Sequence, residues 1–359
     1  DESTVRKLTR RLGPGVVDEA VRHVIAVAVA ERGFRPRAMR ADSTVAEADV
    51  RYPTDVGLAA DAVRVLAKAA RKVTAAVPDA TSRVRDRSRA VNKRVRAIGR
   101  SLRRRTGEAK AEVQRLTEEA AAQVRASVRE SRKLLAQAQA SPLAAEGASV
   151  KARAKAAARL EELVGLSERI VDQVRARFAG EKIPDRLVSL FDPDARPVRR
   201  GKLAKPNQFG YVVQYAEVTA NTKRGAGGLL LPPKLQAGST HENTLLTQSA
   251  AELTRLGISL KEAAFDAGFT QAATDKSLPG LDRLFIAGSA NNPGSPRTRR
   301  RLAKFRVGCE GRISHLTREY HSRRGRLKGE TGARIWQARA ALSYNIDTVA
   351  AMPTKPDTS

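Results

Sequence analysis

The chain has 359 residues, of which 67 are Lys or Arg and 38 are Asp or Glu, so its formal net charge is +29. That length allows two or three domains, and the single cysteine, Cys309, excludes both an internal disulfide framework and a cysteine-based zinc site. No apolar run approaches the roughly 18 residues of a membrane span. The positive charge favours nucleic acid as a partner over an anionic membrane, because the basic residues do not face a Trp- and Phe-rich apolar stripe.

Residues 1–35 are predicted to form a helical N-terminal segment, which Gly13-Pro14-Gly15 divides into two helices. Apolar and polar residues then alternate between 37 and 51, so the first strand is predicted within residues 36–55. Pro53, Thr54 and Asp55 turn the chain. The chain begins with Asp1 instead of Met, and we therefore expect it to be an internal fragment of a longer protein.

Residues 56–190 are rich in Ala, Arg and Glu, and their apolar residues recur at spacings of three and four. This pattern predicts long amphipathic helices packed as an antiparallel bundle or coiled-coil hairpin, with breaks near Pro78, Gly107 and Ser141. Between Arg83 and Arg105 there are eleven basic residues and one acid, Asp86. Such a run can be a solvated helix face, but it is so one-sided that contact with phosphates is the preferred interpretation.

The rest of the chain returns to strands and helices after a polar linker at 191–208. Strands are predicted at 209–215, 229–231, 263–265 and 284–287, helices at about 243–256, 298–321 and 330–350, and a tail at 351–359. Without the helical block the order is β-β-β-α-β-β-α. This order predicts an α/β fold: a ribonuclease-H-like mixed sheet flanked by helices and interrupted after the first strand by a long all-α insertion.

Three acids stand where a two-metal nuclease needs them. Asp42 lies on the first strand, Asp266 at the end of the short strand 263–265, and Glu310 at the edge of the apolar stripe of helix 298–321. Carboxylate ligands favour Mg²⁺ or Mn²⁺ over zinc, and a pair of such ions can cleave a phosphodiester. The plain alternative for Glu310 is a surface ion pair with Arg306, four residues earlier.

Two further groups of residues allow two interpretations each. Thr44, Tyr52 and Asp55 either brace the first block, residues 42–55, or Pro53, Thr54 and Asp55 form only the N-terminal cap of the next helix. His315 and His321 are interpreted as packing or phosphate-contacting residues instead of general bases, because a metal mechanism does not need a histidine. Trp336 is predicted to lie in the core.

Three segments resemble the catalytic blocks of bacterial insertion-sequence transposases of the DDE class: DSTVAEADVRYPTD (42–55), AAFDAGF (263–269) and RRLAKFRVGCEGRISHLTREYHSRRGRLKG (300–329). RKLTRRLG near the start and GARIWQARAALSYNIDTVA near the end are also similar to family segments, so the resemblance covers essentially the whole chain. The family signature Y-x2-R-x3-E-x6-K is kept at Arg306 and Glu310, whereas Ala303 and Thr317 replace its Tyr and Lys, with Arg318 next to Thr317.

This resemblance implies that Asp42, Asp266 and Glu310 are catalytic and hold two Mg²⁺ or Mn²⁺ ions. The implied reaction is cleavage at the ends of a mobile element with water, followed by attack of the 3′-hydroxyl on target DNA. Residues 1–35 would be the end of a DNA-binding region, and residues 36–55 and 209–350 the catalytic domain. We expect DNA contacts from seven arginines: Arg103, Arg104, Arg105, Arg306, Arg318, Arg323 and Arg324.

The implied partners are double-stranded DNA at element ends and target, with a homodimer formed on the DNA. The expected location is the bacterial cytoplasm, with association to the nucleoid when DNA is bound. Two alternatives stand beside this hypothesis. One is a catalytically decayed transposase relic that acts only as a basic DNA-binding protein, and the other is a related metal-dependent nuclease without strand transfer.

Overall fold

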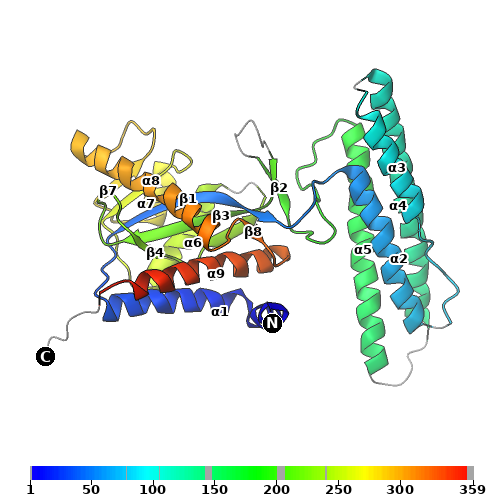
Figure 1. Ribbon diagram of the computed structural model, residues 1–359, viewed down its shortest axis with the longest axis horizontal. Helices are drawn as coiled ribbons and strands as arrows, with labels where there is room; N and C mark the ends of the chain where they lie inside the picture. The colour runs from blue at the N-terminus through cyan, green and yellow to red at the C-terminus, as the bar shows by residue number, and fades with distance from the viewer. Residues whose placement is uncertain are drawn as a thin grey trace. The chain divides into compact units, whose positions relative to one another are not determined.

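The computed structural model describes residues 2–77, 79–104, 106–141, 148–199, 207–238 and 241–353. The chain forms two compact units (Figure 1). Unit 1 contains Asp1–Asp49 and Asp194–Ser359, and unit 2 contains Val50–Pro193. Unit 2 thus extends a few residues beyond each end of the expected insertion, 56–190. The fold is α/β, with a mixed, open sheet in unit 1 and a helical bundle in unit 2.

The sheet of unit 1 is ordered β2-β3-β1-β6-β7. Its long central strands β1 and β3 are antiparallel, while β6 is parallel to both β1 and β7. Short strands β4 and β5 pair with β3, and β8 pairs with the end of β1. The strands are β1 (Ala38–Ala48), β2 (Arg196–Arg199), β3 (Asn207–Thr219), β4 (Gly228–Leu230), β5 (Lys234–Ala237), β6 (Glu262–Phe265), β7 (Arg283–Ile286) and β8 (Arg324–Gly325).

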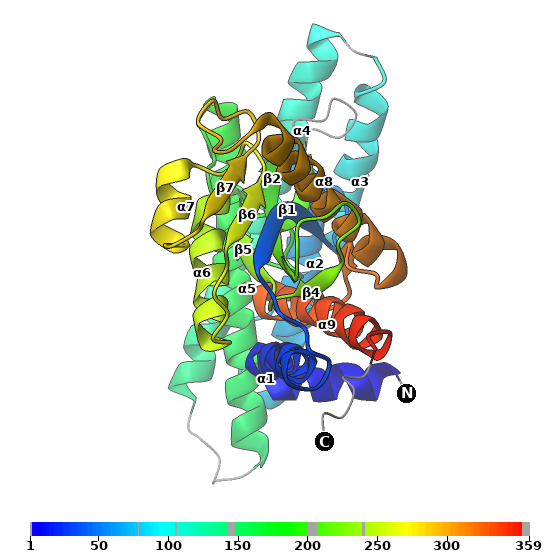
Figure 2. The same cartoon turned by 90° about the vertical axis from the view of Figure 1, so that its left-hand side faces the viewer.

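Alternating residues of β1 face different helices. Met39 and Ala41 belong to the main core, which includes residues of α1, α6 and α9, whereas Ala38 packs with Leu302 and Phe305 of α8. Figure 2 shows α6 and α7 on one side of the sheet and α8 on the other. The helices of unit 1 are α1 (Glu2–Glu31), α6 (Glu242–Arg255), α7 (Gln271–Ser277), α8 (Pro296–Glu319) and α9 (Gly329–Ala350). The predicted break in the first helix is confirmed, since Gly13 has non-helical torsion angles (φ 77°, ψ 174°).

Unit 2 is a bundle of four helices in the described part of the chain: α2 (Asp55–Ala76), α3 (Ser88–Ser101), α4 (Gly107–Ala140) and α5 (Ala148–Phe178). Leu66, Leu134, Leu160 and Ile170 are fully buried in its core, as the apolar spacing predicts. The helix ends agree with the predicted breaks at Gly107 and Ser141, whereas Pro78 lies outside the described residues.

The start of α2 decides between the two interpretations of Thr54 and Asp55. Thr54 is the N-cap, and its side-chain oxygen accepts a hydrogen bond from Gly57 N at 3.1 Å. The buried Asp55 carboxylate binds Arg177 at 2.7 Å and Arg186 at 2.9 Å, all within unit 2. Thr54 therefore caps α2, as one of the two interpretations predicts, and Asp55 joins the start of α2 to Arg177 and Arg186 of unit 2.

Several short elements were not expected from the sequence. The segment 191–208, expected to be a linker, contains β2, which pairs with β3 through Val198 and Gln208. Strands β5 and β8 and helix α7 were also missed. They span two to seven residues, too few for a periodic pattern to emerge. Their pairing is fixed by the neighbouring long strands and not by their own composition.

Candidate functional site

The parallel pairing of β1 and β6 brings the first two predicted acids together. Ala41 lies opposite Phe265, so the next residues, Asp42 within β1 and Asp266 just after β6, lie at the same level of the sheet. Ser43 N donates to Asp42 Oδ1 at 2.7 Å, and Ala267 N donates to Asp266 Oδ1 at 2.8 Å. Each carboxylate is thus oriented by the backbone amide of the next residue.

Glu310 reaches the same place from α8. Arg306 Nη1 lies 3.1 Å from Glu310 Oε1 and 3.5 Å from Asp266 Oδ1, so one guanidinium bridges two of the acids. The expected ion pair between Arg306 and Glu310 is present, and it forms part of the acid cluster instead of an isolated surface pair. The structure therefore brings all three predicted acids together.

Charge repulsion within the cluster is visible at Asp42. Burial raises the pKa of the Asp42 carboxyl above its ordinary value, and the carboxylates of Asp266 and Glu310 raise it further. The Ser43 amide and the Arg306 guanidinium act in the opposite direction. A half-buried carboxyl among like charges is one that a bound cation stabilises in its ionised form.

A buried ionic network holds α8 against the sheet. Arg40 on β1 and Glu217 on β3 are directly opposite each other, and Arg40 Nε donates to Glu217 Oε2 at 2.8 Å. Arg40 Nη1 also donates to the backbone oxygen of Phe305 at 2.8 Å, and Arg312 Nη2 donates to Glu217 Oε1 at 3.0 Å. Both contacts join α8 to the sheet on either side of Glu310.

Close approach of α8 to this network requires glycine at position 308. A Cβ atom there would lie 1.9 Å from Arg40 Nη1. The sequence signal that could have found this network is the presence of Arg40 and Glu217 within otherwise apolar strands, since buried charges need partners.

A fourth carboxylate, Glu242, lies beside the cluster and was missed from the sequence. It is the first residue of α6. Burial and then the charges of Asp42 and Asp266 raise the pKa of Glu242 to about 6. The buried Ser43 hydroxyl makes no well-formed hydrogen bond among the described residues, yet lies near enough to the Glu242 carboxyl to favour its ionised form.

The donor set suits a hard divalent cation, because its members are all carboxylates. Nevertheless, no three His, Cys, Asp or Glu side chains in the described part of the chain are arranged so that they could hold a metal ion as they stand. Arg306 lies between Asp266 and Glu310 and forms an ion pair with both. The carboxylates are therefore of the type that binds a divalent cation, and they lie in the same region. In the arrangement seen, the guanidinium of Arg306 lies between two of them.

The other expected DNA-binding arginines are in different surroundings. Arg318 is exposed near the end of α8. Arg323 pairs with Glu47 at 3.5 Å and Arg324 with Asp49 at 2.6 Å, next to the end of β1. Arg103 and Arg104 are exposed after the end of α3 in unit 2, and Arg105 lies outside the described residues.

The two histidines and the tryptophan of the last block have structural contacts. His315 packs edge-on against Tyr320 and Tyr344, with ring centroids 5.5 and 5.9 Å away. Trp336 Nε1 donates to the backbone oxygen of His321 at 3.0 Å, and the indole packs on a small core cluster. Packing is therefore the interpretation that the structure supports for His315, whereas His321 is exposed and contacts Trp336 through its backbone oxygen.

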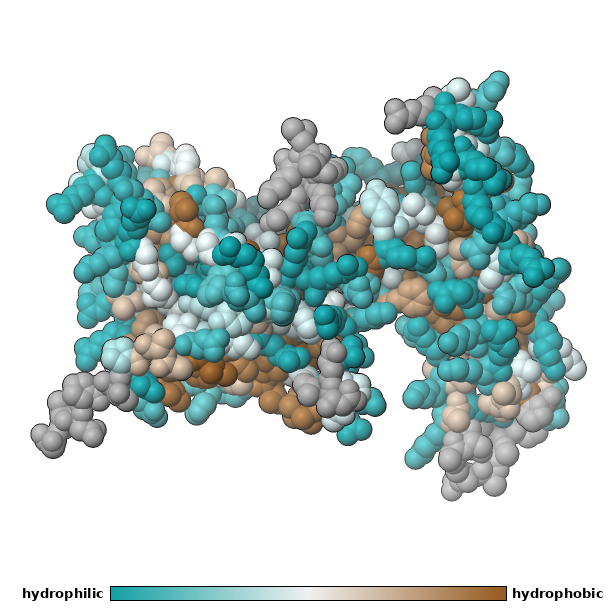
Figure 3. All heavy atoms as spheres, viewed as in Figure 1, coloured by the Kyte–Doolittle hydropathy of each residue, from teal (hydrophilic) through white to brown (hydrophobic). Residues whose placement is uncertain are grey.

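The surface is hydrophilic over most of the face in Figure 3.

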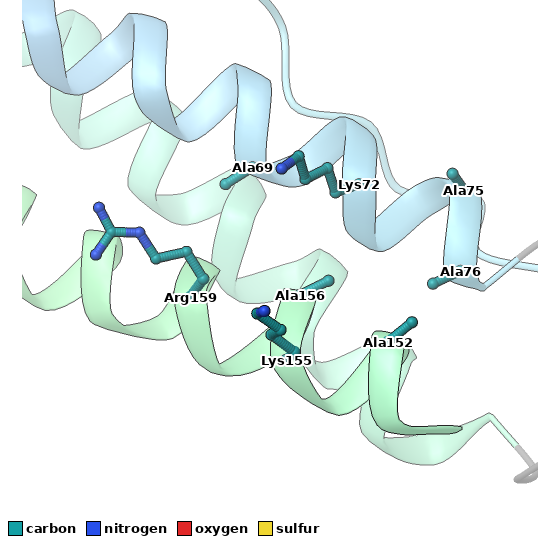
Figure 4. Close-up of a pocket in the computed structure, with 8 residues that line it drawn as sticks. All are labelled: Ala69, Lys72, Ala75, Ala76, Ala152, Lys155, Ala156 and Arg159. Atoms are coloured by element: carbon teal, nitrogen blue, oxygen red, sulfur yellow. The ribbon is translucent and has the colours of Figure 1, made fainter. Parts of the chain in front are cut away.

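A hollow of about 680 Å³ lies between α2 and α5 in unit 2, and Figure 4 shows three cationic side chains along it. It is lined by alanines and by these cations, without an acid: Ala69, Lys72, Ala75, Ala76, Ala152, Lys155, Ala156 and Arg159. Across the described residues, no helix combines the length and apolar character needed to cross a membrane.

Comparison with protein-family models, with curated proteins and with solved structures found no match to this chain.

Proposed function

We propose that this protein is a metal-dependent DNA transposase that cleaves the ends of a mobile element and joins them to target DNA. The observation that carries the proposal is the meeting of Asp42, Asp266 and Glu310, which come from β1, the end of β6 and α8, around the single guanidinium of Arg306. Asp42 lies more than 200 residues before Asp266 and Glu310 in the sequence, and each of the three lies in a segment that resembles a DDE-class block.

The strand order also supports a ribonuclease-H-like catalytic domain. An antiparallel group around β3 and β1 continues into the parallel strands β6 and β7, and α8 covers the face that carries Asp42. In open α/β sheets, ligands bind outside the carboxyl ends of the parallel strands, which is where Asp266 lies. The insertion of unit 2 between β1 and β2 agrees with the expected interruption of this domain.

The acids would hold two Mg²⁺ or Mn²⁺ ions, which supply activation of the attacking oxygen and stabilisation of the leaving oxygen. Asp42 and Asp266 each accept a hydrogen bond from the backbone amide of the next residue, which orients their carboxylates. Arg306 pairs with Asp266 and Glu310 in the arrangement seen, and its side chain would move away when these carboxylates bind a metal ion. Arg306 is then free to contact a DNA phosphate beside the site.

Binding of the DNA backbone would rely on cationic surfaces of both units. In unit 2, the outer face of α3 carries Lys93, Arg96 and Arg100, which are exposed and make no ion pair among the described residues. Arg87 and Arg94 of the same run instead bind Glu130 and Glu119 and hold α3 on α4. The run between 83 and 105 is thus divided between packing and an exposed face suited to phosphates.

Nicking of supercoiled plasmid DNA tests the proposal. We expect the wild type to nick in Mg²⁺ or Mn²⁺ but not in EDTA. Asp42→Asn and Glu310→Gln should each reduce the rate at least about a hundredfold, because losing a ligand removes several kcal/mol of transition-state stabilisation. Glu319→Gln, an exposed acid on the same helix as Glu310, is the matched control and should leave the rate unchanged. Equal nicking by wild type and Asp42→Asn would remove the catalytic assignment.

A joining assay separates the transposase from a plain nuclease. Transfer of a labelled DNA 3′-hydroxyl end into the plasmid supports strand transfer. Nicking without joining would support the nuclease alternative. Salt-dependent DNA binding without either reaction would support the relic, in which only the basic surface remains functional.

A further inference from the structure

The hollow between α2 and α5 in unit 2 has cations on both sides, and no acid is among the described residues that line it. Lys72 comes from α2, whereas Lys155 and Arg159 come from α5 (Figure 4). The rest of the lining is alanine, whose short side chain leaves the space open and carries no polar group. The volume of about 680 Å³ is that of an ordinary ligand site.

Lysines one helical turn away continue the positive charge along both helices. Lys68 lies four residues before Lys72 on α2, and Lys151 lies four residues before Lys155 on α5. These four lysines and Arg159 are all exposed. Residues four apart share one side of a helix, so Lys151, Lys155 and Arg159 form a row about 12 Å long.

The lysines around the hollow have no counter-ion within the part of the chain that the structure describes. None of the four forms an ion pair there, and Arg159 pairs only with the exposed Glu162 at 2.5 Å. The acids of the neighbouring helix α4 that form ion pairs do so with arginines. Cations that face one another without an acid repel, and an anion bound between them removes that repulsion.

The row on α5 favours a repeated anion over a single one. Phosphates of one DNA strand follow each other at about 3.4 Å along the duplex axis, so a row about 12 Å long spans about three or four of them. Lys72, on the other side of the hollow, can contact the same strand. The alanines offer no side-chain donor or acceptor that could read a base edge.

We propose that the hollow between α2 and α5 binds the phosphate backbone of DNA, as a second DNA contact of unit 2 besides the exposed face of α3. This inference rests on the proposed function, because it takes from there DNA as the anion. Binding in the hollow is independent of base sequence, since only charge and shape recognise the ligand.

Alkylation of an introduced thiol tests the site without changing its charge. The native cysteine, Cys309, is buried, so N-ethylmaleimide reports on the introduced thiol in the folded full chain. Ala152→Cys places the thiol in the hollow, and Ala158→Cys, elsewhere on α5, is the matched control; both alanines are exposed. A short DNA duplex at about ten times its Kd should slow alkylation of Ala152→Cys about tenfold. Alkylation of Ala158→Cys should keep its rate.

Removal of charge gives a second, independent measurement. Lys72→Gln combined with Lys155→Gln should reduce the slope of log affinity against log salt by about 0.9 for each lost phosphate contact, or about 1.8 in all. The control combines Lys110→Gln with Lys133→Gln, which removes the same charge from exposed positions on α4 outside the hollow. Its slope should equal that of the wild type.

The two measurements separate failure of this inference from failure of the proposed function. If DNA binds and is nicked, yet neither slows alkylation of Ala152→Cys nor responds to the loss of Lys72 and Lys155, the hollow is overturned and the proposed function stands. If the wild type binds no DNA, both fail. Polyglutamate that protects Ala152→Cys as well as DNA does would overturn the DNA assignment in favour of an acidic protein. Protection by DNA alone, with the reduced slope, supports the hollow even without nicking.

Discussion

Glu217 offers a sharp test of how the fold positions the site. Its side chain is fully buried and accepts hydrogen bonds from Arg40 at 2.8 Å, Arg312 at 3.0 Å and Gly228 N at 3.0 Å. Glu217→Gln keeps the shape of the side chain but removes its charge. Two guanidiniums, one of them almost fully buried, then lose their common counter-ion.

The expected loss of stability in Glu217→Gln depends on the contacts that Arg40 and Arg312 retain. Breaking a buried ion pair by neutralising one partner costs roughly 3–5 kcal/mol. Arg40 retains the carbonyl oxygens of Phe305 at 2.8 Å and Ala226 at 2.9 Å. Arg312 retains its stacking on Tyr344, with 4.2 Å from the guanidinium carbon to the ring centre. We therefore expect the lower end, a loss of about 3 kcal/mol in the free energy of unfolding.

The single tryptophan, Trp336, lies on α9 in unit 1, so its fluorescence reports unfolding of the unit that contains Glu217. Urea unfolding followed at Trp336 should show the loss in Glu217→Gln. The control is Glu19→Gln, which removes an exposed partner of Arg22 and should cost below about 0.5 kcal/mol. A loss below about 1 kcal/mol in Glu217→Gln would refute the reasoning that this network secures α8.

Three further predictions concern pH, salt and capping. The pKa of Glu242 in the folded chain, about 6, lies above its ordinary value, so its ionisation destabilises the fold. As the pH rises from 4.5 to 7, the free energy of unfolding of the metal-free protein should therefore fall by about 1 kcal/mol, after allowing for solvent screening. Glu242→Gln should remove this part of the pH dependence, measured by the fluorescence of Trp336. Neutralising Arg103 and Arg104 together should reduce the slope of log affinity against log salt by about 0.9 per lost phosphate contact, and an unchanged slope would place DNA elsewhere. Thr54→Ala should destabilise the start of α2 by about 1 kcal/mol, seen as faster amide exchange in its first turn.

Long periodic elements and the three acids could be predicted because their signals are local. The alternation in β1, the apolar stripes of α2, α4 and α5, and the break at Gly13 are each contained in a short stretch of sequence. Asp42 and Asp266 are candidate site residues because of their positions at strands and because their segments resemble DDE-class blocks. Their meeting depends on the register of β1 and β6, which the structure supplies.

Glu242 and the Arg40 network could not be identified in the same way. Nothing near Glu242 in the sequence distinguishes it from an ordinary acid in the first turn of a helix. Its position follows from its contact with Gly268 and from the hydrogen bond of the neighbouring Asn243 to Thr270, which only the folded chain creates. Likewise, β2 has four residues including Pro197, and its pairing is determined by β3 instead of its own composition.

The most direct test of the central claim is a crystal structure of the protein with Mn²⁺ and its anomalous scattering map. We predict manganese peaks at about 2.1 Å from carboxylate oxygens of Asp42 and Asp266, with the Arg306 side chain displaced from Glu310. Crystals grown in millimolar Mn²⁺ that show Arg306 still bridging Asp266 and Glu310, without a peak beside Asp42, would contradict it.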